Sequence, residues 1–172
     1  MNDLLKFKRN AVMLGLCGEY KSRWDSAKNK QDLMDIALDA NGVEMLCDAA
    51  AFGWGMDIQY MKNAFSEYIN GNWKRKKDGY TSCLYVLHDG VIEQECTITA
   101  LISCNGEFHV PKGKACKLYV SGNSNINVTG EGDCYVYLYG DCKVTGNRKL
   151  IHCYQESLWV RKADVSLKKE SL

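Results

Sequence analysis

The chain has 172 residues and a mass of 19.4 kDa, and 46% of its residues are hydrophobic. That is enough to build the core of one ordinary domain or two small ones, which excludes disorder as the main state. Its 22 Lys and Arg residues against 21 Asp and Glu residues leave a formal charge of +1. No overall electrostatic field therefore selects nucleic acid, a membrane or an acidic ligand as the partner.

Two features predict a cytoplasmic protein with no membrane partner. Lys6, Lys8 and Arg9 interrupt the first apolar residues, so no secretory signal is visible. Every apolar run is also far shorter than the roughly 20 residues that span a bilayer. The nine Cys are an odd number in a chain well above the size of disulfide-stapled domains. We therefore expect reduced thiols.

Residues 1–71 are predicted to form a helical unit. Their apolar residues recur every three or four positions, which places them on one face of a helix. The four stripes are Leu4, Phe7, Ala11 and Leu14; Leu33, Ile36, Ala37 and Ala40; Val43, Leu46, Cys47 and Ala50; and Ile58, Met61, Phe65 and Tyr68, with a further short helix around Tyr20 and Trp24. Asn41 followed by Glu44 resembles a capping box, and Asp57 is a good N-cap residue for the last helix.

The pattern changes after residue 71. Residues 72–79 contain four consecutive basic residues and are predicted to be a linker. Residues 80–167 then follow the period of two that is typical of β-strands, so this unit is predicted to be all β. Asp89-Gly90 is predicted to be a two-residue hairpin turn. Residues 168–172 are expected to be a loose tail.

A weak internal repeat with a mean step of about eight residues begins after Ala115. Each short β-like triplet ends at an apolar residue or His and is followed mostly by polar or Gly positions: the triplets end at Val120, Val128, Leu138, Val144, His152, Val160 and Leu167. Gly122, Gly130, Gly140 and Gly146 stand two residues after the first four, where a chain corner favours Gly. Such repeats bury a core only when they are stacked, which predicts a short β-solenoid with two steps, about 16 to 18 residues, in each turn. An antiparallel meander remains the alternative, because Gly140-Asp141 and Gly146-Asn147 also suit hairpins.

The predicted fold is therefore α+β, with a helical unit followed by an all-β unit that forms a short solenoid. The two ends of a short solenoid have unpaired edges that must be covered. The helices and the Asp89-Gly90 hairpin are expected to cover one end, and a second chain the other. This predicts a homo-oligomer.

The segment from Asp133 to Val144 carries a resemblance to known proteins. Its sequence, DCYVYLYGDCKV, resembles short β-solenoid repeats of uncharacterised bacterial and phage proteins, in which a small residue, an apolar residue and a Tyr-Gly-Asn/Asp corner recur about every eight positions. The resemblance covers residues 108–167, implies the solenoid fold and brings no catalytic residues. Phe52-Gly53-Trp54-Gly55 and Tyr80-Thr81-Ser82-Cys83 are also similar to segments of small proteins from phages and mobile elements.

The cysteines do not form a recognisable chemical site. Cys116, Cys134 and Cys142 share strand parity with the apolar residues, so they are predicted to face the interior, with Cys116 and Cys134 stacked in adjacent turns. None of the nine has the C-x₂-C partner typical of zinc sites. His88, His109 and His152 lack a local signature tying them to a nucleophile, and no nucleotide-binding loop is present. We expect no metal, no cofactor and no enzyme activity.

Two groups of residues are candidates for binding. By strand parity, Tyr119, Tyr135, Tyr137 and Tyr139 point outward and form a ladder, a rigid surface suited to protein contact. The alternative is that these rings pack beneath the helical unit. Lys74, Arg75, Lys76 and Lys77, with Trp73 beside them, suit phosphates and unpaired bases, although a solvated linker has the same composition.

From sequence we therefore expect a non-enzymatic module for protein binding or self-association, such as an accessory protein of a phage or mobile element. The first alternative is a nucleic-acid-associated regulator that uses the basic linker. The second is an enzyme with a site between the two units.

Overall fold

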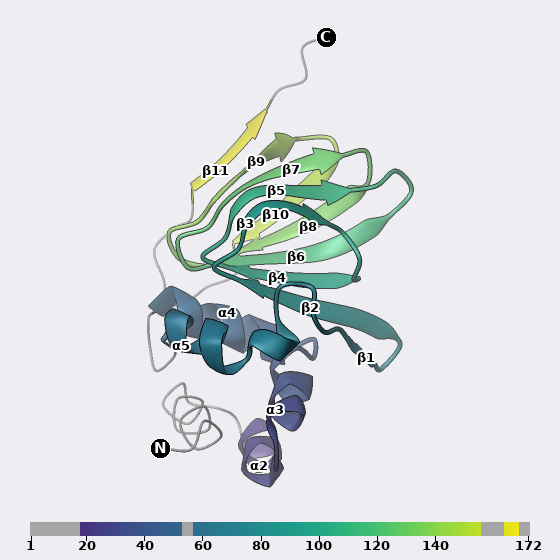
Figure 1. The fold of residues 1–172 in the computed structure, drawn as a ribbon. Coiled ribbons are helices and arrows are strands. Elements are labelled where there is room, and N and C mark those ends of the chain that lie inside the picture. Colours follow the sequence, from purple (N-terminus) through teal and green to yellow (C-terminus); the bar gives the residue numbers. More distant parts are fainter. Residues whose placement is uncertain (1–17, 53–56, 156–163, 169–172) are drawn as a thin grey trace.

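The computed structural model describes residues 18–52, 57–155 and 164–168 (Figure 1). Helix α2 spans Gly18–Ser26, α3 Lys30–Ala37, α4 Gly42–Phe52 and α5 Ile58–Ala64, followed by a 3₁₀ turn, η1, at Ser66–Tyr68. The third predicted stripe lies within α4, whereas the second and fourth extend past the ends of their helices: Ala40 is in the turn after α3, Phe65 is the C-cap of α5 and Tyr68 is in η1. The first stripe, at Leu4 to Leu14, lies outside the described residues. Asp57 caps α5 as predicted, because its carboxylate accepts from the backbone N–H groups of Gln59 and Tyr60.

The remaining chain alternates between two sheets. One sheet, sheet A, has the order β1-β2-β4-β6-β8-β10, and the other, sheet B, has the order β11-β9-β7-β5-β3. The strands are β1 (Arg75–Lys77), β2 (Tyr80–Val86), β3 (Asp89–Glu93), β4 (Ile98–Ile102), β5 (Asn105–Val110), β6 (Ala115–Ser121), β7 (Asn125–Gly130), β8 (Asp133–Leu138), β9 (Lys143–Asn147), β10 (Ile151–Gln155) and β11 (Asp164–Lys168).

Parallel pairing decides between the two predicted β architectures. Every pair from β2 to β11 is parallel and joins a strand to the next strand but one, as in β2 with β4 or β3 with β5. The partners of Ser82 along sheet A are Ile98, Lys117, Tyr135 and His152, so successive turns take 16, 19, 18 and 17 residues. The solenoid is therefore confirmed and the meander is excluded.

The interior of the solenoid is a narrow apolar core. It contains Cys83, Ile92, Leu101, Phe108, Leu118, Val120, Ile126, Val136, Leu138 and Val144, together with Cys96, Cys104, Cys116, Cys134 and Cys142. Cys116 and Cys134 stack in adjacent turns with their sulfur atoms 3.9 Å apart, as their spacing predicts. Cysteine here fills the position of a small hydrophobic residue.

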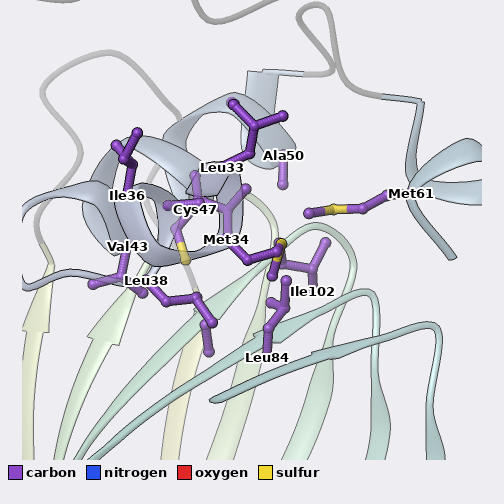
Figure 2. Packing of buried hydrophobic residues seen from close by; sticks show 14 of the residues in the cluster. Leu33, Met34, Ile36, Leu38, Val43, Cys47, Ala50, Met61, Leu84 and Ile102 are labelled. Carbon is purple, nitrogen blue, oxygen red and sulfur yellow. The ribbon is translucent and has the colours of Figure 1, made fainter. Parts of the chain in front are cut away.

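A second core joins the helices to the outer face of sheet A. Met34, Leu38 and Cys47 from the helices face Leu84 and Ile102 of the sheet (Figure 2). Two serine hydroxyls on the sheet reach the helices: Ser82 Oγ donates to the carbonyl of Leu38 at 2.6 Å, and Ser121 Oγ donates to that of Cys47. The helical unit thus packs along the side of the solenoid.

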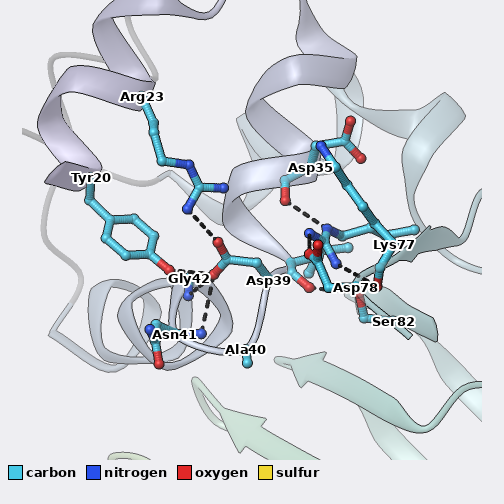
Figure 3. Close-up of polar contacts among 12 residues, drawn as sticks. Tyr20, Arg23, Asp35, Asp39, Ala40, Asn41, Gly42, Lys77, Asp78 and Ser82 are labelled. Carbon is cyan, nitrogen blue, oxygen red and sulfur yellow. Dashed lines mark hydrogen bonds and ion pairs between the residues drawn. The ribbon is translucent and has the colours of Figure 1, made fainter. Parts of the chain in front are cut away.

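Asp39 organises the helical unit. Its carboxylate accepts hydrogen bonds from Tyr20 Oη and Arg23, both at 2.6 Å, and from the backbone N–H groups of Asn41 and Gly42 at the start of α4 (Figure 3). The sequence predicted a capping box with Asn41 as the N-cap residue. In the structure, the carboxylate of Asp39, two residues earlier, accepts the backbone hydrogen bonds at the start of α4. Burial alone would raise the pKa of Asp39, but the hydrogen bonds from Tyr20, Gly42 and Arg23 together lower it.

Two predicted turns and the predicted linker differ in the structure. Asp89-Gly90 is not a hairpin turn, because β3 begins there and pairs with β5 in the sheet opposite β2. The hairpin lies instead at Asp78-Gly79, where both residues have positive φ, between β1 and β2. Within the predicted linker at residues 72–79, residues 75–77 thus form a strand of sheet A. Gly146 is not a corner, because it lies inside β9, where Ile151 fills the space that its side chain would occupy.

Replacing Gly106 should test the close stacking of turns. Gly106 has φ +136°, and a Cβ there would lie 2.1 Å from the carbonyl oxygen of Gly90 in the turn below. We expect Gly106→Ala to destabilise the fold by about 3 kcal/mol or more in urea unfolding, because strain and overpacking add. Gly113→Ala is the matched control, because Gly113 also has positive φ but open space around it. Equal losses in both variants would contradict this account.

Asp39→Asn should lower the free energy of unfolding by about 1.5 to 3 kcal/mol at pH 7, since hydrogen bonds to a charged group are lost. The lowered pKa of Asp39 stabilises the fold above the pKa of the unfolded carboxyl, and this stabilisation disappears as pH falls through the folded pKa. The difference between variant and wild type should therefore shrink in acid. Asp141→Asn, at an exposed position, is the control. A difference that does not change with pH would contradict the assignment.

Candidate assembly surface

The structure forms the predicted tyrosine ladder but covers most of it. Tyr119 and Tyr137 stack across adjacent turns with ring centroids 4.7 Å apart and planes within 11°. Tyr119 and Tyr139 are only 2% and 1% exposed, because they belong to the core beneath the helices. Burial raises the pKa of the Tyr139 phenol well above its ordinary value. The prediction of a four-residue exposed strip is corrected: strand parity was right, but the helical unit lies over these rings.

Tyr135 is the member of the strip that remains exposed, at 36%. Its ring stacks on His152 of the next turn with centroids 4.7 Å apart. His152 Nε2 lies 3.9 Å from the carboxylate of Asp133. Tyr137 is half-buried against the helical core. What remains of the predicted surface is thus one stacked pair at the side of β8 and β10.

The predicted basic segment is divided between structural and exposed residues. Arg75 is 1% exposed; its Nε donates to the carbonyl of Asp35 at 2.8 Å, and its guanidinium pairs with Asp78. Lys74 forms an ion pair with Glu95. Trp73 packs edge-on against Tyr68. Lys76 and Lys77 are left exposed, so the structure does not present four adjacent cations on one surface.

The thiols are buried and most are held in their neutral form. The cysteines at positions 47, 83, 96, 104, 116, 134 and 142 are free and buried. Burial raises the pKa of Cys104 to about 11 and that of Cys142 to about 12. Cys96 differs, because a hydrogen bond from Cys83 lowers the pKa of its thiol. The side chain of Cys96 is nevertheless fully buried. Across the described ranges, no group of three or more His, Cys, Asp or Glu residues converges as metal ligands.

The free surface that the sequence did not reveal is the edge of β3. Among the described strands, β3 pairs only with β5 and is the last strand of sheet B. The carbonyl of His88 accepts from Asn105, and the N–H of Gln94 donates to His109, so even-numbered residues of this segment bond to β5. The alternation of a parallel ladder then turns the N–H and C=O groups of Asp89, Val91 and Glu93 toward the open edge.

Side chains around this edge are exposed and acidic. Val91 is 61% exposed, the highest value among the large hydrophobic residues that the structure describes. Asp89 and Glu93 flank it, and Glu107 stands beside it on β5. The first turn of sheet A differs, because β1 pairs with β2 and covers that edge. We call Asp89, Val91 and Glu93 with their open backbone groups the β3 edge.

Sequence reasoning missed this edge because it read Asp89-Gly90 as a hairpin turn. The signal against that interpretation is the recurrence of the same type of dipeptide, Asn105-Gly106, 16 residues later. In the structure these dipeptides are register partners in β3 and β5. A repeated Asp/Asn-Gly step at the spacing of a solenoid turn marks stacked positions rather than a local hairpin.

No family model, curated protein or solved structure matches this chain. In the part that the structure describes, no helix is long and apolar enough to cross a membrane.

A comparison of two tyrosines should separate structural from exposed rings. Tyr139→Ala should destabilise the fold by about 3 to 5 kcal/mol in urea unfolding, because it empties a large buried site. Tyr135→Ala should change stability by less than about 1 kcal/mol, since that ring is exposed. Similar values for the two variants would show that the helices do not cover Tyr139 as described.

Proposed function

We propose that this protein is a non-enzymatic binding and assembly module that engages another chain through the β3 edge. The observation that carries the proposal is an unpaired parallel edge with an exposed valine, in a solenoid whose other sheet is closed at the same end by β1. Free edges of this kind pair readily with strands of other chains, which add to the sheet by main-chain hydrogen bonds.

The other surfaces of the solenoid support this proposal, because their side chains are already engaged in packing or hydrogen bonding. Helices cover the outer face of sheet A around Tyr119 and Tyr139, and the solenoid interior is filled with apolar side chains. The outer face of sheet B carries polar side chains bonded between turns, such as Thr145 to Asn127 at 2.8 Å and Asn105 to Asp89 at 3.1 Å. Such side chains bond to one another, whereas the outer backbone groups of β3, an edge strand of sheet B, have no strand partner among the described residues.

The size of the edge sets the expected strength of binding. Three residues offer at most a few backbone hydrogen bonds, each with a net value of about 1 kcal/mol, plus the burial of one valine. Association through this edge alone should therefore be weak, with a dissociation constant on the order of 10 to 1,000 µM. Self-association therefore has to be measured at protein concentrations of the same order as this dissociation constant.

Val91→Pro is the test of this proposal. Proline removes an N–H that points to the open edge and leaves the bonds to β5 intact, so the fold should persist. Sedimentation velocity between about 5 and 500 µM should show concentration-dependent self-association of the wild type and a monomer for Val91→Pro. Val91→Ala, which keeps the N–H, is the matched control and should associate more weakly than wild type but more strongly than the proline variant.

Two results would overturn the proposal. One is a wild-type protein that stays monomeric over the whole range. The other is association of Val91→Pro that equals that of the wild type, with both variants showing wild-type unfolding midpoints.

A further inference from the structure

We infer that the partner of the β3 edge is the opposite end of a second copy of this chain, so that the protein associates head to tail into open linear assemblies. This inference rests on the proposed function and names the occupant of the same surface. Its basis is the distribution of charge along the solenoid axis, together with the direction in which the strands stack.

Charge changes sign along the solenoid. Residues 80–110, which form the first two turns, contain four acidic residues and no Lys or Arg, a formal charge of −4. Residues 111–142 contain three basic and three acidic residues. The described residues 143–155 and 164–168 contain four basic residues and one acidic residue, a formal charge of +3. Within the solenoid turns, without β1 and the helices, the charge therefore changes from acidic at the β3 end to basic at the β11 end.

The acidic charge lies on the side of the free edge. Asp89, Glu93 and Glu107 are exposed on β3 and β5 of sheet B. The fourth acidic residue, Glu95, is already paired with Lys74. The exposed lysines of the first turn, Lys76 and Lys77, belong to β1 in sheet A, beside the edge that β1 closes. The exposed charged side chains around the β3 edge are thus acidic, and the exposed lysines of β1 belong to the other sheet.

These acidic residues select among possible strand partners. Two β3 edges that pair with each other would bring Asp89 and Glu93 of both copies together, and like charges on facing strands are unfavourable. A symmetric dimer through this edge is therefore disfavoured. A basic strand end is favoured, and long-range attraction between opposite charges also accelerates the encounter.

The basic end of the same chain has the required direction. Strands of sheet B run parallel from β3 to β11, and β11 pairs with β9 as the last described strand of the sheet. If β3 of a second copy is placed next to β11 of the first, with its strands in the same direction, it continues the same parallel ladder. Exposed Lys143 and Arg148 lie in the turn before this end. Because the two contacting surfaces differ, the contact does not close on itself and assemblies grow in one dimension.

Charge reversal near the basic end tests the inference. The variant Lys143→Glu/Arg148→Glu should self-associate at least about tenfold more weakly than wild type at low ionic strength, because opposite charges become like charges. Lys112→Glu/Lys114→Glu is the matched control, with the same change in charge in the neutral middle of the solenoid; it should associate like the wild type. Wild-type association should weaken at 0.5 M salt, where charges are screened within about 4 Å.

A mixing experiment then reports the direction of the contact. Val91→Pro has a blocked head and an intact tail, whereas Lys143→Glu/Arg148→Glu has an intact head and a repelled tail. Head-to-tail contact requires each variant to be monomeric alone and the equimolar mixture to form dimers and nothing larger in sedimentation velocity. Mixing Val91→Pro with the Lys112→Glu/Lys114→Glu control should instead produce shortened chains of several copies.

The outcomes separate this inference from the proposed function. If the wild type is monomeric, the proposed function fails, and this inference fails with it. If the wild type associates and Val91→Pro does not, but Lys143→Glu/Arg148→Glu associates like wild type, the β3 edge is used and the basic end is not its partner. A monomeric equimolar mixture of the two blocked variants would also overturn the head-to-tail contact.

Discussion

Parallel, in-register pairing between strands one turn apart is the interaction on which the rest of this structure depends. Each pairing joins residues 16 to 21 positions apart, so a single turn buries little and the turns are stable only as a stack. Register also decides which side chains meet. It places Cys116 on Cys134 inside the solenoid and Tyr119 on Tyr137 outside it. The narrow interior accepts small apolar side chains, which is why cysteine occupies so many of its positions without forming a reactive site.

The helical unit determines which parts of this stack meet solvent. It docks on the outer face of sheet A, and residues that would otherwise form an aromatic surface become a second core. Arg75 shows the same effect for charge, because it is buried between the carbonyl of Asp35 and the carboxylate of Asp78 rather than displayed to a polyanion. Part of each binding surface suggested by the sequence, Tyr119 and Tyr139 in one and Arg75 in the other, is thereby buried between the helices and the sheet.

The two sheets end differently at the start of the solenoid, and the proposed binding surface follows from this difference. In sheet A, β1 turns back through Asp78-Gly79 and pairs antiparallel with β2, which covers the first edge. In sheet B, the chain enters β3 directly from the corner after β2, so the described residues supply no strand to cover β3. Acidic side chains stand around that edge, and charged side chains of this kind disfavour the pairing of two such edges.

The sequence by itself predicted the strand periodicity, a turn of about 16 to 18 residues and the parity of the side chains, because these are local properties. It favoured a solenoid, but only the parallel pairing of the strands excluded an antiparallel meander. It also determined the helical stripes and the N-cap at Asp57. Only the tertiary structure decided that Tyr119 and Tyr139 are buried, that Arg75 is structural and that Asp89-Gly90 begins a strand in the opposite sheet. Parity tells which face of a strand a residue occupies, but whether that face is exposed depends on where a distant helix packs. The free β3 edge is likewise a property of the complete stack, since an edge exists only once every other strand has found its neighbours.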